Sequence, residues 1–127
     1  MNCRQTMWSL AAVIVLVTGA AQAGDLEDAA AALESKDYAK ARRLVTPIAQ
    51  RGDRGGQRIL GFMYMYEAGV PLDYVRAYMW WSLAAASGDS KSGEYRDSVG
   101  KILTPEQLAQ ARKMAADCKA RKFKGCN

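Results

Sequence analysis

The feature that most constrains the fold of this chain is an internal repeat with a period of 36 residues. Six identities recur in one register within a window of 17 positions. A period in the thirties is typical of helical repeat proteins, in which each pair of helices buries its apolar side against neighbouring pairs. The paired residues are Asp37, Tyr38, Ala41, Ala49, Gly52 and Asp53 with Asp73, Tyr74, Ala77, Ala85, Gly88 and Asp89.

The N-terminus has the pattern of a secretory signal peptide. Arg4 precedes an apolar run over residues 8–17, and the small residues of Ala21-Gln22-Ala23 follow it. The run is shorter than the roughly 20 apolar residues that span a membrane. We therefore expect residues 1–23 to be cleaved between Ala23 and Gly24, with a retained anchor as the alternative. The mature chain should then be periplasmic or secreted, without stable membrane insertion.

The expected mature chain, residues 24–127, is long enough for one small domain. Its formal net charge is +4 once Arg4 leaves with the leader. We expect the positive charges to be spread along the helices and not gathered in one run. Their excess favours encounters with acidic partners or anionic envelope surfaces. No nucleic-acid-binding motif occurs, so we expect no nucleic-acid partner.

Two cysteines remain after the expected cleavage, Cys118 and Cys126. In an exported chain such a pair favours one disulfide, which would pin the C-terminal tail to the last helix. A reactive pair is the alternative, but redox motifs normally have two residues between the cysteines.

Apolar residues follow a helical period along nearly the whole mature chain, and no strand pattern competes with it. Asp37 and Asp73 stand where they can cap helices, and Gly52 and Gly88 stand where helices end. Thr104 begins a capping box that predicts a final helix from about Pro105 to Arg121. We expect an all-α fold of five or six short helices, with residues 24–34 left undecided between a helix and a loose arm.

One stretch resembles a Sel1-like repeat. The resemblance covers residues 57–89 as a full repeat and residues 37–53 as part of a preceding one, with residues 105–121 as a closing helix. It implies a short right-handed solenoid of antiparallel helix pairs, related to tetratricopeptide arrays. The residues that carry it are Leu60-Gly61-Phe62-Met63-Tyr64, Gly69-Val70-Pro71, Asp73-Tyr74, Ala77, Trp80, Ala84-Ala85 and Gly88.

Two departures from the repeat pattern predict local disorder. Glu67 stands where the family usually has a loop glycine, and Gly55-Gly56 stands where an alanine usually begins the first helix. Glycine within a helix costs about 0.5 to 1 kcal/mol relative to alanine. We therefore expect this helix to fray at its start or to begin only at Gln57.

The resemblance also implies a function, because Sel1-like proteins serve mainly as adaptors that bind a protein or peptide on the concave side of the solenoid. It places four candidate partner-binding residues there: Arg58, Phe62, Met65 and Tyr66. The competing interpretation is that Phe62 and Met65 only pack under the next helix. A self-associating structural protein is a second possibility, and we expect a monomer or a weak homo-oligomer.

An enzymatic function finds little support, since the chain has no histidine, the commonest general base and metal ligand. We expect no catalytic residues, no metal and no cofactor. A serine and a lysine can together form a nucleophile, and several serines lie near Lys91. These residues do not match a known catalytic motif. Some secreted Sel1-like proteins are associated with penicillin binding or hydrolysis, which leaves a weak enzymatic alternative.

Overall fold

A computed structural model describes residues 21–127, and within that range the chain forms six helices and no strand. The all-α expectation is confirmed. Most of the expected signal peptide, residues 1–23, lies outside the described residues, so the signal peptide and cleavage between Ala23 and Gly24 stay predictions. The helices are α1 (Ala21–Glu34), α2 (Tyr38–Gln50), α3 (Arg54–Met65), α4 (Tyr74–Ala86), α5 (Ser90–Gly100) and α6 (Pro105–Ala120).

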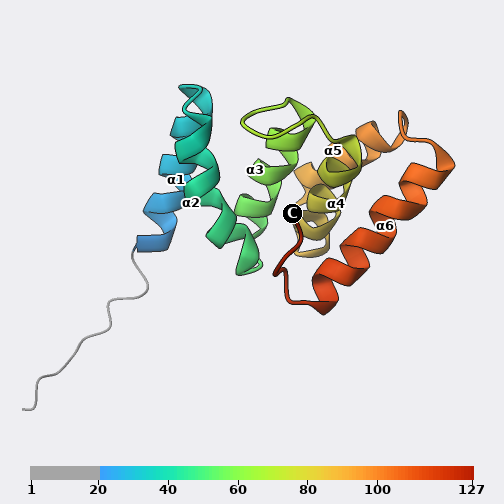
Figure 1. The fold of residues 1–127 in the computed structure, drawn as a ribbon. Helices are drawn as coiled ribbons and strands as arrows, with labels where there is room; N and C mark the ends of the chain where they lie inside the picture. Colours follow the sequence, from blue (N-terminus) through green and yellow to red (C-terminus); the bar gives the residue numbers. More distant parts are fainter. Residues whose placement is uncertain (1–20) are drawn as a thin grey trace, which may run out of the picture.

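The first five helices pack in chain order, each against the next (Figure 1). α1 also touches α3, while α6 packs against α4. α4 is therefore the central element, with α3, α5 and α6 around it. None of the described helices has both the length and the apolar character needed to cross a membrane.

Aspartates begin the helices at the places that the repeat pattern predicts. Asp37 accepts a hydrogen bond from the amide of Lys40 at 3.2 Å, and Asp73 accepts one from the amide of Arg76 at 2.9 Å. Each satisfies one of the free amides in the first turn of α2 and α4. These two helices begin 36 residues apart and end 36 residues apart.

Of the two expectations for the start of α3, a start at Gln57 is wrong, because the helix begins at Arg54. Asp53 caps it by accepting a hydrogen bond from the amide of Gly56 at 3.0 Å. The missing side chain at Gly56 also allows α3 to approach α2 closely. A Cβ added there would lie 2.8 Å from the backbone nitrogen of Ala49.

The core contains buried residues from all six helices, and Trp80 and Trp81 of α4 lie within it. Gly61 leaves room for the indole of Trp81, whose Nε1 donates a hydrogen bond to the carbonyl oxygen of Arg58 at 3.1 Å. The absence of a side chain at Gly61 therefore lets an aromatic ring pack against the backbone of α3.

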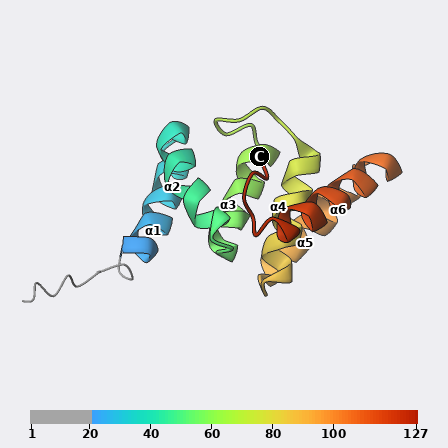
Figure 2. The same cartoon turned by 60° about the horizontal axis from the view of Figure 1, so that its bottom comes forward.

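The disulfide between Cys118 and Cys126 is confirmed, with an S–S distance of 2.04 Å. After α6 the tail turns back and ends beside α3 and α4 (Figure 2). Phe123 lies against Gly52, and the Tyr64 hydroxyl donates a hydrogen bond to Asn127 Oδ1 at 3.4 Å. The tail is therefore part of the folded domain.

Two further expectations about helices have clear outcomes. Residues 24–34, left undecided by the sequence, belong to α1. The final helix ends at Ala120, one residue short of the expected Arg121, and its capping box between Thr104 and Gln107 is present.

Candidate functional site

One side of α3 faces away from the core and lies between α1 and α5. Gly55, Arg58, Phe62 and Tyr66 fall on this side because they are spaced by three or four residues. All four are at least partly exposed. We call this surface the α3 face.

An aromatic cluster forms the middle of the α3 face. The ring of Phe62 lies 4.9 Å from that of Tyr95 in α5 and 5.4 Å from that of Trp81 in α4. Tyr66 stacks on the outer side of Phe62 at 6.2 Å and is 68% exposed. The cluster is thus rooted in the core through Trp81 and reaches solvent at Tyr66.

A small apolar hollow lies at one end of the α3 face, where α3 ends. Its volume is about 200 Å³, below the roughly 300 to 1,000 Å³ of typical small-molecule sites. Its size and lining suit a single apolar side chain. The lining residues are Leu33 of α1, Tyr38 of α2, Phe62, Tyr66 and Ala68.

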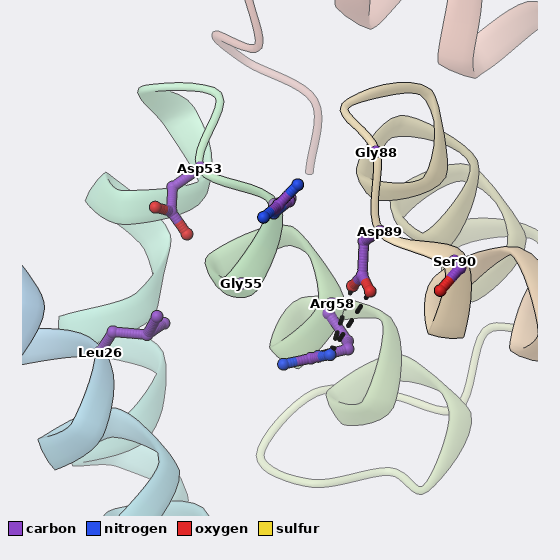
Figure 3. A pocket seen from close by; sticks show the side chains of 8 residues that line it. Leu26, Asp53, Gly55, Arg58, Gly88, Asp89 and Ser90 are labelled. Carbon is purple, nitrogen blue, oxygen red and sulfur yellow. Dashed lines mark hydrogen bonds and ion pairs between the residues drawn. The ribbon is translucent and has the colours of Figure 1, made fainter.

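A more polar hollow of about 370 Å³ lies at the other end, where α3 begins. Figure 3 shows Leu26 on one side of it and Asp89 and Ser90 on the other, with Arg58 between them. Its remaining lining residues are Asp53, Arg54, Gly55 and Gly88.

The charges in this polar hollow are only loosely paired. Arg58 Nη1 lies 3.5 Å from Asp89, and the Arg58 side chain is 41% exposed. Asp89 accepts a shorter hydrogen bond, 2.8 Å, from the Ser92 hydroxyl. Most of the donors on the Arg58 guanidinium therefore remain free for a carboxylate or a peptide carbonyl.

The structure brings three of the four candidate residues, Arg58, Phe62 and Tyr66, onto the α3 face. Met65 is partly buried against the core and lines neither hollow. Phe62 combines both interpretations of the sequence, because it packs under α4 and α5 and also lines the apolar hollow. The binding role of all four stays a prediction.

Sequence reasoning missed the residues that other helices contribute to this face. Trp81 and Tyr95 were not among the candidate residues. Leu33 and Tyr38 lie in a part of the chain outside the full repeat. The recurrence of Tyr38 at position 74 was visible, but helical periodicity does not show which helix each ring meets.

Two of the residues considered as a nucleophile, Ser92 and Lys91, have other partners. Ser92 is buried and donates its hydroxyl hydrogen bond to Asp89, while Lys91 Nζ lies 3.6 Å from Glu94. Within residues 21–127 no group of three or more histidine, cysteine or acidic side chains is arranged to hold a metal ion.

No protein-family model, curated protein or solved structure matches this chain. The resemblance to Sel1-like repeats accordingly stays a prediction from the residues that carry it.

Proposed function

We propose that this protein is an extracytoplasmic protein-interaction module, a short right-handed solenoid of Sel1-like helix pairs that binds a protein or peptide partner on the α3 face. The observation that carries the proposal is the aromatic cluster, which is anchored in the core at Trp81 and exposed at Tyr66. Aromatic residues of this kind dominate the energetics of protein interfaces.

Tyr66 supports binding because its ring is exposed and already packed against Phe62. Burying one such side chain on a partner contributes roughly 1.5 to 3 kcal/mol. The ring stacks on Phe62, which Trp81 and Tyr95 hold in turn. Little side-chain freedom is therefore lost when a partner covers Tyr66, and preorganisation of this kind raises affinity.

The two hollows indicate which chemical groups a partner would place on the α3 face. Eight residues of helix separate Arg58 from Tyr66, which corresponds to about 12 Å along the axis. An extended chain covers that distance in about four residues at roughly 3.3 Å each. We infer a short segment with an apolar side chain near Tyr66 and a carboxylate or backbone carbonyl near Arg58.

The proposal is tested by affinity capture of tagged residues 24–127 from an envelope extract, read by mass spectrometry. The Tyr66→Ala variant should lose a partner that the native domain retains. Tyr74→Ala is the matched control, since Tyr74 is also an exposed tyrosine, 37% accessible, but lies at the start of α4 and lines neither hollow.

Circular dichroism of both variants checks that each remains folded. Equal recovery of every protein by the native domain and Tyr66→Ala would contradict binding at the α3 face. Sedimentation of the native domain at several concentrations separates this outcome from self-association, the alternative function, in which the captured protein is a second copy of the chain.

A further inference from the structure

A cluster of positive charge lies where α6 ends. Four of the six residues in 119–124 are lysine or arginine, and no acidic side chain occurs from Lys119 to Asn127. The expectation that the positive charge is spread along the helices and not gathered in one run is therefore wrong here. We call residues 119–124 the basic loop; its cations are Lys119, Arg121, Lys122 and Lys124.

All four cations are exposed, and no ion pair within residues 21–127 involves any of them. The acidic residue before the loop, Asp117, is already paired with Lys113 at 2.6 Å. α1 contains four acidic residues and no basic one, and in both views α2 and α3 lie between α1 and the end of α6 (Figure 1, Figure 2). The charge of the basic loop is therefore not neutralised by the fold.

The basic loop is held in place and does not hang free as a tail. The disulfide from Cys118 to Cys126 closes it, and Phe123 packs against Gly52. The amide of Phe123 also donates a hydrogen bond to the Cys118 carbonyl oxygen at 2.9 Å. Its four cations are consequently presented from one fixed segment, which lowers the entropy lost when they meet a charged surface.

We propose that the basic loop adsorbs this protein to an anionic lipid surface. All four cations are exposed, and none of them lines either hollow at the ends of the α3 face. An exposed cationic loop suits a flat, negatively charged surface. Phe123 is partly buried in the fold and does not supply an inserting side chain, so the attachment is electrostatic and reversible.

The test measures sedimentation of residues 24–127 with vesicles of phosphatidylcholine mixed with phosphatidylglycerol, beside vesicles of phosphatidylcholine alone. Binding should require phosphatidylglycerol and should be lost in about 1 M salt, where screening acts over about 3 Å. One lysine or arginine near an anionic surface changes the partition coefficient by about fivefold. The triple variant Arg121→Gln, Lys122→Gln, Lys124→Gln should therefore bind about a hundredfold more weakly.

The control variant Lys36→Gln, Lys40→Gln, Arg43→Gln removes the same charge from the first half of α2 and the turn before it, while Gly52, which Phe123 touches, lies beyond the other end of α2. It should bind nearly as well as the native domain.

Three results would overturn the proposal. One is equal weakening by the two triple variants, which would make net charge the cause. Another is no binding to phosphatidylglycerol. The third is association of the protein with itself in low salt without lipid, lost in the basic-loop variant, which would make a second copy the partner.

Discussion

Gly61 determines how tightly α3 and α4 pack. A Cβ at this position would overlap the indole of Trp81, including the Nε1 that donates to the Arg58 carbonyl. The position therefore links the core to the α3 face, because Trp81 also supports the ring of Phe62.

Replacement of Gly61 by alanine is expected to lower the free energy of unfolding. The added methyl group must displace the Trp81 ring, and overpacking of this kind costs about 2 kcal/mol. Urea denaturation of the purified domain measures the change.

Gly93→Ala is the matched control for Gly61→Ala. Gly93 also lies within a helix, but a Cβ there meets its nearest atom at an ordinary 3.8 Å. This substitution should stabilise the domain by about 0.5 to 1 kcal/mol. Equal effects of the two substitutions would contradict the packing described for Trp81.

Ionisation of Tyr64 makes the free energy of unfolding depend on pH in the alkaline range. Burial raises the pKa of its phenol above the ordinary value of 10.0. Tyr64 makes its full contribution to the free energy of unfolding below about pH 10. Above that pH the phenol ionises in the unfolded chain before it does so in the folded protein. Stability therefore falls as the pH rises through the folded pKa.

Tyr64→Phe should reduce this alkaline loss of stability. The comparison is the free energy of unfolding at about pH 9 and about pH 11 for both proteins. The other tyrosines are common to both and cancel. An identical loss in the variant would show that Tyr64 ionises equally in the folded and unfolded chain.

At the level of the helices, local residue patterns predict ends better than they predict neighbours. The capping roles of Asp37, Asp73 and Thr104 were readable because a cap depends on residues within one turn. The start of α3 was misplaced because the cost of Gly55-Gly56 in a helix was weighed alone. Close packing of α3 on α2 and the Asp53 cap offset that cost, and the packing depends on tertiary structure.

The C-terminal tail is the element that the disulfide controls. Intact mass of the mature domain should be about 2 Da below the reduced value. Removing the link should destabilise the domain by about 2 to 3 kcal/mol, because the unfolded chain regains the freedom of a short loop. Urea denaturation of a Cys118→Ser, Cys126→Ser variant measures this, and unchanged stability would show that packing of Phe123 alone fixes the tail.

At the scale of the whole molecule, the α3 face is assembled from helices that are far apart in the sequence. α1 contributes Leu33 and α5 contributes Tyr95, and both meet Phe62 or its hollow on α3. The resemblance to Sel1-like repeats implied four candidates, and Arg58, Phe62 and Tyr66 lie on one side of α3 while Met65 does not line either hollow. The resemblance could not supply the neighbours, because these depend on how the helices pack against one another.

Binding at this assembled face is the central claim, and site-specific photo-crosslinking tests it most directly. Benzoylphenylalanine, which resembles tyrosine in shape, would replace Tyr66 in one variant and Tyr74 in another, both expressed in the protein's own host. The account predicts a defined crosslinked partner from position 66 and none from position 74. No adduct from position 66, or the same adducts from both positions, would contradict it.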